Sequence, residues 1–418
     1  MRWLPCILLA LILLPVPATA QDAVYREKNQ YPVLDAIRAA RDSARAERDS
    51  VRTMVEDQWK ARREAERAGA KDLRLDWSKI RIPAGPESFK AAWHTPPVAQ
   101  YYTGSCWAFC ATSFLESEAH RLHGVEAKLS EMWFVYWEYV EKARLHLESY
   151  GATPVEEGSQ DHGVLEVLRI YGAVPADAYP GVLAANGRHD HAPMLKELKT
   201  YLKWVLEAGT IDPERASRDV RAILDAHMGP VPEDFVWQDK SYTPRAFADQ
   251  VLRLDPDRYL SCVSRLDKPF YTRVLLDVPD NWRRKADYFN LPLDDFYKVL
   301  FQAVSDGVTV TLGGDNSEPG MDGLHDAAIV PEWDIPARWI NQASRELRIT
   351  NGTTGDDHGV HAVGVLRHEN RDWFLVKDSN RSSRLGKHEG YYMWDGDYIR
   401  LKMLTFMVDK ERLGTLLD

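Results

Sequence analysis

The spacing of hydrophobic residues changes near Gly307 in this chain of 418 residues. Before that point, hydrophobic residues recur every three or four positions, which predicts amphipathic helices. Three such helices are expected: from Cys106 to a stop at Gly124, from the N-cap Ser130 to Tyr150, and over residues 160–172. Residues 190–300 are also predicted to be mostly helical, with several Pro breaks.

After Gly307 the helical spacing gives way to short runs rich in β-branched and aromatic residues. Strands are expected at Val308–Leu312, Val360–Leu366, Trp373–Lys377, Gly390–Trp394 and Leu401–Val408. A helical part followed by a strand-rich part predicts an α+β protein with two lobes.

Residues 33–68 have a different pattern, in which charged residues and Ala dominate and Gly and Pro are absent. A thin apolar stripe passes through Val51, Val55 and Trp59. This predicts one long polar helix. Four interpretations stay open: a solvated helix packed lightly on the body, a stalk, an oligomerisation arm, or a removable pro-segment.

Residues 1–20 have the pattern of a secretory signal peptide. Arg2 precedes an apolar run from Leu4 to Leu14, and Ala18-Thr19-Ala20 has the small-residue form that a signal peptidase requires. The apolar run is about half of the ~20 residues that a membrane-spanning helix needs. We therefore expect cleavage before Gln21, export to a periplasm or the outside of the cell, and no stable membrane insertion.

Composition narrows the class of protein further. A formal net charge of −10 argues against a general nucleic-acid binder, which needs a basic face. Only four Cys are present, which excludes a disulfide framework, and three of them (Cys106, Cys110 and Cys262) follow the leader. An odd number in an oxidising compartment leaves at least one free thiol.

The candidate chemistry centres on Cys106, which opens a predicted helix directly after a turn at Gly104. A thiol at a helix N-terminus experiences the positive end of the helix dipole, which favours the nucleophilic thiolate. Such a nucleophile also needs an oxyanion hole. The amide of Gln100, six residues upstream, is a candidate donor beside the Cys106 backbone N–H.

A cysteine nucleophile also needs a base, and His361 is the best candidate because it is a polar residue inside the apolar run Val360–Val365. The second nitrogen of that imidazole needs an acceptor. Asp378 follows seventeen residues later, at the end of the next predicted strand, and is expected to supply that acceptor.

The run Gly104-Ser105-Cys106-Trp107-Ala108-Phe109 resembles the nucleophile motif of the papain-like cysteine peptidases. Within that clan the chain is most similar to the bleomycin hydrolase / aminopeptidase C branch, over about residues 75–410. That resemblance rests also on the following stretches: Leu129–Glu131, Tyr136–Glu138, Glu157–Gln160, Tyr171–Pro175 and Thr243–Phe247.

The resemblance implies a papain-like fold, with a helical lobe, a β-barrel-like lobe, a helical insert and an N-terminal helix. It assigns Cys106 as nucleophile, His361 as general base and acid, and Gln100 as oxyanion donor. The third position, usually Asn, falls on Asp378, and Asn380 stands where a shielding Trp is usual, so Asn380 is an alternative third member.

The expected organisation is a leader (1–20), a charged N-terminal helical segment (21–74), a helical lobe with the Cys (75–185), a helical insert (186–300) and a β lobe (301–418). No cofactor or metal is implied. The expected partner is a peptide or protein substrate, and the resemblance also implies that copies assemble into a homo-oligomer.

The expected function is cysteine-type peptide-bond hydrolysis, by an aminopeptidase or a broad peptidase. The branch has a C-terminal arm that restricts cleavage to free N-termini, whereas only eight residues follow Lys410 here, so exo- and endopeptidase action both stay open. The alternative from another class is a catalytically weak, papain-fold binding protein, which the departures at Asp378 and Asn380 favour.

Overall fold

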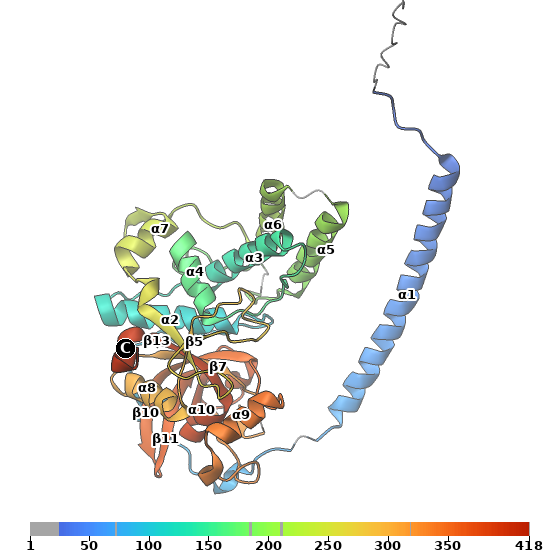
Figure 1. The fold of residues 1–418 in the computed structure, drawn as a ribbon. Coiled ribbons are helices and arrows are strands. Elements are labelled where there is room, and N and C mark those ends of the chain that lie inside the picture. Colours follow the sequence, from blue (N-terminus) through green and yellow to red (C-terminus); the bar gives the residue numbers. More distant parts are fainter. Residues whose placement is uncertain (1–24, 72, 184–185, 210–211, 318, 418) are drawn as a thin grey trace, which may run out of the picture. The chain divides into compact units, whose positions relative to one another are not determined.

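The computed structural model describes residues 25–71, 73–183, 186–209, 212–317 and 319–417 (Figure 1). The chain divides into two compact units, Met1–Asp72 and Leu73–Asp418. The expected signal peptide over residues 1–20 lies outside the described residues. No helix within the described part of the chain is long and apolar enough to cross a membrane.

The described part of the first unit consists mainly of one helix of 37 residues, α1 (Pro32–Ala68). Pro32 occupies its first turn, where a missing N–H costs nothing, and Gly69 follows its last residue. No residue of α1 is buried. The predicted long polar helix over residues 33–68 is therefore confirmed as a helix.

The second unit begins with three helices that match the predicted ones: α2 (Cys106–His123), α3 (Glu131–Glu148) and α4 (Asp161–Tyr171). Gly124 ends α2 in the left-handed conformation, with φ of 66°. The hydroxyl of Ser130 caps α3 by accepting a hydrogen bond from the N–H of Trp133. These local signals explain why both helix boundaries could be read from the sequence.

The segment expected to be a mostly helical insert is helical only in its first half. Its helices are α5 (Ala192–Ala208), α6 (Pro213–Met228) and the short α7 (Pro244–Phe247). Strands then replace helices: β2 (Phe235–Trp237) pairs with β3 (Lys240–Tyr242), and β4 (Tyr259–Val263), β5 (Arg273–Val274) and β6 (Tyr288–Asn290) follow. Apart from the helical stretch over residues 244–252, the prediction for residues 235–290 was wrong, because the strands are short and β4 pairs with a strand far away in sequence.

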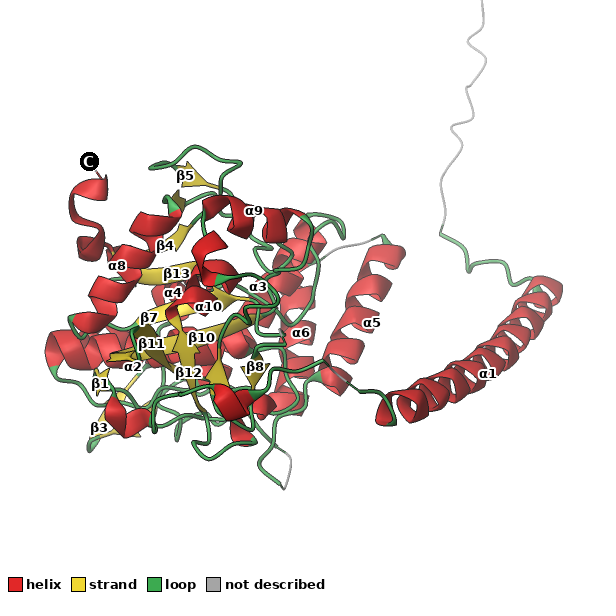
Figure 2. Ribbon diagram, turned by 90° about the horizontal axis from the view of Figure 1, so that it is seen from below, coloured by secondary structure: helices red, strands yellow, loops and turns green. Residues whose placement is uncertain are grey.

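Strands β4 to β6 extend one large, mostly antiparallel sheet, in the order β5-β6-β4-β13-β7-β10-β11-β12-β9-β8, with β1 against β10. The remaining strands are β1 (Lys90–Ala91), β7 (Val310–Gly314), β8 (Met321–Asp322), β9 (Ala327–Ala328), β10 (His358–His368), β11 (Arg371–Lys377), β12 (Tyr391–Asp395) and β13 (Met403–Asp409). The helices between these strands are α8 (Leu293–Ser305), α9 (Gln342–Thr350) and α10 (Gly396–Lys402). Figure 2 shows β7, β10, β11 and β12 in the centre of this unit, where β11 lies between β10 and β12 in the sheet. The strands predicted after Gly307 are thus confirmed, with small shifts at their ends.

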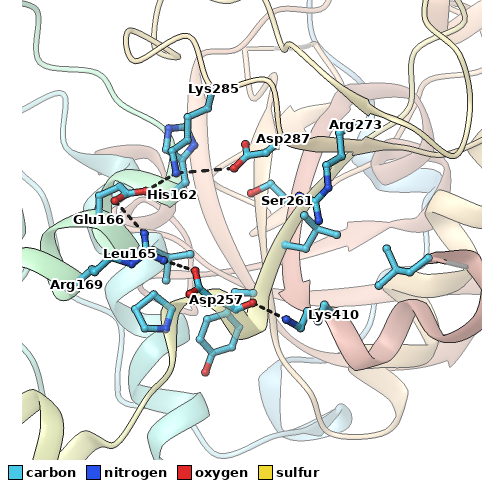
Figure 3. A pocket seen from close by; sticks show the side chains of 14 residues that line it. His162, Leu165, Glu166, Arg169, Asp257, Ser261, Arg273, Lys285, Asp287 and Lys410 are labelled. Atoms are coloured by element: carbon cyan, nitrogen blue, oxygen red, sulfur yellow. Dashed lines mark hydrogen bonds and ion pairs between the residues drawn. The ribbon is translucent and has the colours of Figure 1, made fainter.

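A charged cavity of about 310 Å³ borders α4, β4 and the C-terminal helical turns over Lys410–Leu417 (Figure 3). Its charged side chains are tied to one another, since Arg169 binds Glu166 at 3.1 Å and Lys285 lies 3.8 Å from Asp287. His162 lines it too, and burial, followed by the charge of Lys285, lowers the pKa of this imidazole to about 3.

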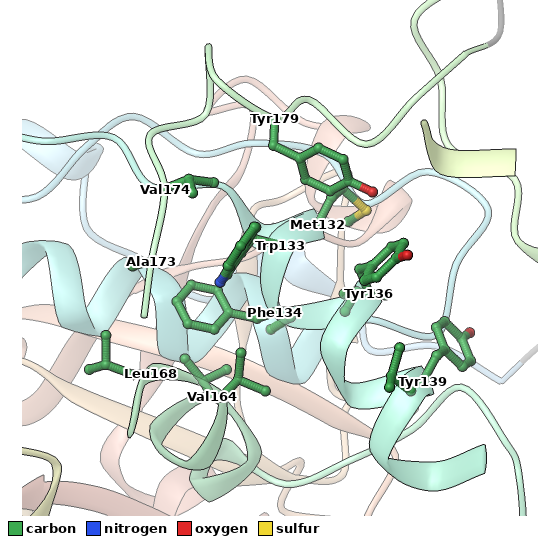
Figure 4. Packing of buried hydrophobic residues seen from close by; sticks show 14 of the residues in the cluster. Met132, Trp133, Phe134, Tyr136, Tyr139, Val164, Leu168, Ala173, Val174 and Tyr179 are labelled. Carbon is green, nitrogen blue, oxygen red and sulfur yellow. The ribbon is translucent and has the colours of Figure 1, made fainter. Parts of the chain in front are cut away.

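The helical core is built around α3 and α4 (Figure 4). Trp133 and Phe134 of α3 face Val164 and Leu168 of α4, and all four side chains are buried. The indole N–H of Trp133 donates to the carbonyl of Gly172, which satisfies the one polar atom of that side chain. This core holds the α2–α4 lobe together, so that α2 presents its first turn in a constant position.

Candidate active site

Cys106 is the first residue of α2 and its side chain is half-buried. Negative charge is stabilised at a helix N-terminus. Glu157 supports the preceding turn, because its carboxylate accepts from the Gly104 N–H and its carbonyl accepts from the indole N–H of Trp107 at 3.2 Å. A Cβ at Gly104 would lie 2.7 Å from the Cβ of Glu157, so this close approach requires glycine.

Helix α2 lies against strand β10, which joins the helical and β parts of the unit. A Cβ at Gly359 would lie 3.4 Å from the Cα of Trp107. The Cys110 thiol donates to the carbonyl of Val360 at 2.9 Å. The first turn of α2 and the first residues of β10 are thereby brought together.

The histidine that the structure places beside Cys106 is His358, the first residue of β10. Its side chain forms a hydrogen bond with Cys106, and its Nε2 lies 2.6 Å from Oδ1 of Asp378. Burial alone would lower the pKa of His358, but the negative charges of Asp378 and Cys106 outweigh burial and raise that pKa well above its ordinary value. The imidazole is therefore held in its charged form between a sulfur and a carboxylate.

His361 is not at this site, and the prediction that it lies beside Cys106 is wrong. Its side chain is fully buried, and its Nδ1 lies 2.8 Å from the Ser113 hydroxyl, two turns along α2 from Cys106. Lys377 donates to the same hydroxyl at 2.7 Å. Burial, followed by the charge of Lys377, holds the pKa of His361 well below its ordinary value.

The reason is the geometry of the β10–β11 hairpin. Side chains alternate between the faces of a strand, so residues three apart point to opposite sides. A bulge between Ala362 and Gly364 shifts the pairing by one residue, and His361 therefore lies opposite Lys377 instead of Asp378. The signal that sequence reasoning missed is the alternation itself, which separates His361 from His358.

Asp378 lies where it was expected, at the end of β11, and it accepts from the imidazole that the sequence did not identify. Its Oδ1 also accepts from the backbone N–H of Asn380 at 2.9 Å. The side chain of Asn380 itself caps the helical turn Arg381–Arg384 and is not brought to His358. The geometry therefore favours Asp378 over Asn380 as the acceptor.

Gln100 is buried beside the same group of residues. Its Oε1 accepts from the Ser379 hydroxyl at 2.7 Å, and its Nε2 donates to the Thr103 carbonyl at 2.6 Å. An amide nitrogen carries two N–H groups, so one N–H remains for an oxyanion after the bond to Thr103. Ser379 thus links the position of Gln100 to that of Asp378.

The two other described cysteines have no such environment. Cys110 is buried, and burial, followed by the charge of Asp161, raises the pKa of its thiol well above the ordinary value. Cys262 is buried on β4, where burial also raises its thiol pKa. Among the described cysteines, Cys106 alone combines access to solvent with a histidine partner.

Sequence reasoning also missed a set of carboxylates close to the start of β10. The carboxylate of Asp356 accepts from Nε2 of Gln160 at 2.5 Å. Burial, followed by the charge of Asp280, raises the pKa of Asp356 to about 7. Burial likewise raises the pKa of Asp161 to about 6. No motif marks these side chains, because their desolvation arises only in the folded chain.

Comparisons with known proteins agree with this fold and site. Residues 84–415 match the model of the Peptidase C1-like family. Aminopeptidase C of Listeria monocytogenes is 24% identical over 257 residues, which cover 52% of this chain and 58% of that protein. The mitochondrial cysteine proteinase 1 of Saccharomyces cerevisiae (strain JAY291) is 23% identical over 291 residues, 59% of this chain and 60% of that protein.

Among solved structures, PepW of Lactobacillus rhamnosis has a similar fold, with a TM-score of 0.63 at 19% identity, covering 79% of this chain and 83% of that one. The predicted α+β, papain-like fold is thereby confirmed. The matches span less than two thirds of the length of the two curated relatives.

Proposed function

This chain belongs to the Peptidase C1-like family, and on that premise we propose that it is a cysteine peptidase with Cys106 as nucleophile and His358 as its acid and base. The observation that carries the proposal is that the His358 side chain contacts Cys106 on one side and Asp378 on the other. A nucleophile, a base and a group that orients the base are the arrangement that covalent catalysis requires.

The proposed reaction begins with attack of the Cys106 thiolate on the carbonyl carbon of a peptide bond. The negative oxygen of the tetrahedral intermediate accepts from the Cys106 backbone N–H and from the second N–H of Gln100. The His358 imidazolium gives its proton to the leaving amine, and an acyl-enzyme thioester remains. His358 then takes a proton from water, which attacks the thioester and releases the acid, and the Cys106 thiolate and the His358 imidazolium are restored.

In this mechanism Asp378 fixes the orientation of His358 and stabilises its positive charge. Nε2 is engaged by Asp378 at 2.6 Å, which leaves Nδ1 for the sulfur. A charged Asp supports the imidazolium more strongly than a neutral Asn would. The role of the third member is therefore compatible with the departure from the usual Asn.

We propose further that the substrates are peptides with a free N-terminus. The support is that similar proteins carry the name aminopeptidase C. The test compares peptides with free and acetylated N-termini by mass spectrometry of the products. Removal of single N-terminal residues from free peptides alone is expected, and internal cleavage of acetylated peptides would contradict the proposal.

We propose also that the protein is exported, on the strength of the leader pattern over residues 1–20. N-terminal sequencing of the protein recovered from a secreting host is expected to begin at Gln21. A matched variant with Leu8→Arg and Leu11→Arg interrupts the apolar run and is expected to retain the leader inside the cell. Intact Met1 on protein recovered from the wild-type gene would contradict export.

The activity itself is tested by a peptide epoxysuccinyl probe, which alkylates an activated cysteine. Labelling is expected at Cys106 in the wild-type protein and at no residue in Cys106→Ala, with peptide hydrolysis lost in that variant. Wild-type protein that takes up no probe and cleaves no peptide would favour the alternative function of a papain-fold binding protein.

A further inference from the structure

Nine nonpolar residues of α1 follow the seven-residue repeat of a coiled coil, whereas Leu34 and Val55 lie at its e positions and Trp59 at a b position. The nine occur at positions with alternating separations of four and three residues, which are the a and d positions of the repeat. The members of this seam are Val33, Ile37, Ala40, Ala44, Glu47, Val51, Met54, Gln58, Ala61, Ala65 and Ala68, of which nine are nonpolar. A repeat of 3.5 residues per turn keeps such a seam on one face only when helices supercoil around each other.

The large side chains of the seam are open to solvent. Val33, Ile37, Val51 and Met54 are 72%, 60%, 52% and 54% exposed. No residue of α1 is buried, over a length of 37 residues. Most helical stability in proteins comes from packing of an apolar face, so a helix of this length with this seam calls for a partner.

The ion pairs within α1 lie mainly on the side opposite the seam. Arg45 binds Asp49 at 3.8 Å and Arg52 binds Glu56 at 3.5 Å. These four residues occupy the b and f positions of the repeat, which are outermost in a coiled coil. The ion pairs on this outer face therefore stabilise the single helix and do not involve a second chain.

The charges that flank the seam are mostly without such partners. Arg41 and Arg48 lie at e positions, and Asp57 and Glu64 lie at g positions. Within the described residues, none of these four side chains forms an ion pair. Charges at e and g positions set the partner and the orientation of a coiled coil.

We propose that α1 pairs with α1 of a second copy of this chain as a parallel, in-register coiled coil. In that arrangement, Asp57 of one copy lies beside Arg62 of the other, and Glu47 lies beside Arg48. An antiparallel pair would instead bring the basic e positions of the two copies together, which repel each other. The two Glu47 side chains face each other at a d position in this pair and repel, so the parallel orientation rests on the contacts of Glu47 and Asp57 with the basic e positions of the other copy.

The charge of α1 argues against a lipid surface as the partner that covers its seam. Residues 32–68 contain nine Lys or Arg and eight Asp or Glu, so an anionic membrane would gain little from binding this helix. The proposal concerns α1 alone and does not depend on the peptidase activity of the second unit.

The first test is the mass of the full protein in sedimentation equilibrium at micromolar concentration. The wild type is expected as a dimer, and the seam variant Val51→Glu/Met54→Glu is expected to shift to the monomer. Thr53→Glu, at an exposed c position between them, is the matched control and is expected to stay dimeric. A wild type that is monomeric, or a seam variant as associated as the wild type, would overturn the proposal.

The second test addresses orientation, in a Cys106→Ala background that removes the exposed thiol. Val51→Cys is expected to form a disulfide between copies on oxidation, because identical a positions face each other only in a parallel, in-register pair. Thr53→Cys is the control. No crosslink at residue 51, or equal crosslinking at 51 and 53, would overturn the proposal.

The third test swaps the charges beside the seam. Arg48→Glu is expected to raise the dissociation constant about tenfold, and adding Glu47→Arg is expected to restore it. An unchanged dissociation constant in Arg48→Glu would contradict the pairing. Sedimentation with vesicles of phosphatidylcholine and phosphatidylglycerol tests the lipid occupant, and strong vesicle binding by a monomeric wild type would also overturn the proposal.

Discussion

His358 and His361 lie three residues apart on strand β10, and both side chains are buried. Their pKa values nevertheless move in opposite directions. His358 lies between the negative charges of Asp378 and Cys106, which raise its pKa in spite of burial. His361 is buried beside the positive charge of Lys377, which lowers its pKa further. The comparison shows that the charges facing a buried imidazole decide whether it is available for acid–base chemistry.

The surroundings of His361 also differ from those of His358. Lys377, which shares Ser113 with His361, also donates to the Thr95 hydroxyl at 2.9 Å. Burial lowers the pKa of Lys377 to about 8. This group links α2 to the hairpin in the interior and is expected to stabilise the fold, whereas the group at His358 is expected to perform the chemistry.

The strongest way to separate the two histidines is to remove the imidazole at His358. His358→Ala is expected to lower kcat/KM by about 1,000-fold or more, because the variant lacks both the partner of the thiolate and the acid for the leaving amine. Steady-state hydrolysis of a fluorogenic peptide measures the effect. Activity within tenfold of the wild type would remove His358 from the mechanism.

The reciprocal change acts on stability. His361→Ala is expected to lower the free energy of unfolding by about 2 kcal/mol or more, since it opens a cavity and removes a partner of Ser113. Urea unfolding measures this loss. The activity per folded molecule, normalised by active-site titration, is expected to stay close to that of the wild type. A fall in normalised activity as large as that of His358→Ala would show that His361 is also required for catalysis.

Removing only the charge at Asp378 gives a smaller effect that is visible in the pH profile. The raised pKa means that His358 keeps its proton to high pH and loses it as the pH rises through that value. Asp378→Asn keeps an acceptor but removes the charge, so the alkaline limb of kcat/KM is expected to move down by about one pH unit. Asn380→Ser is a control that keeps a helix-capping side chain and changes no charge. An unmoved limb in Asp378→Asn would mean that Asp378 does not hold the proton on His358.

The smallest expected effect concerns Asp356, close to the start of β10. Its pKa of about 7 in the folded protein exceeds the value of about 3.9 in an unfolded chain. The folded state therefore keeps a proton that the unfolded state has lost, and its stability falls as the pH rises from about 4 to about 7. Asp356→Asn is expected to raise the melting temperature by a few degrees at pH 8 and hardly at all at pH 4. The exposed Asp234→Asn is the control, and equal gains at both pH values would contradict the account.

Much of this molecule could be predicted from residues whose effect is local. Ser130 and Gly124 mark helix boundaries through capping, and Cys106 opens its helix as expected. The family resemblance rests on residues adjacent in sequence, and it led to the correct fold. Asp378 was identified because it ends a recognisable strand.

What could not be predicted depends on contacts between distant residues. Side-chain alternation places His358 and His361 on opposite faces, and the bulge after Ala362, which leaves no mark in the hydrophobic pattern, sets Lys377 opposite His361. Without that bulge, the hairpin would bring His361 opposite Asp378. The strands β4 to β6 were missed for the same reason, because β4 pairs with β13, about 150 residues further along the chain.

The most direct test of the central claim is a pH titration of the histidine side chains by nitrogen-15 NMR, with signals assigned from the His358→Ala and His361→Ala variants. The account predicts that at pH 7.5 His358 is an imidazolium and His361 is a neutral imidazole, and that the Asp378→Asn variant loses the proton from His358 at a lower pH. A neutral His358 beside a charged His361 would contradict the account.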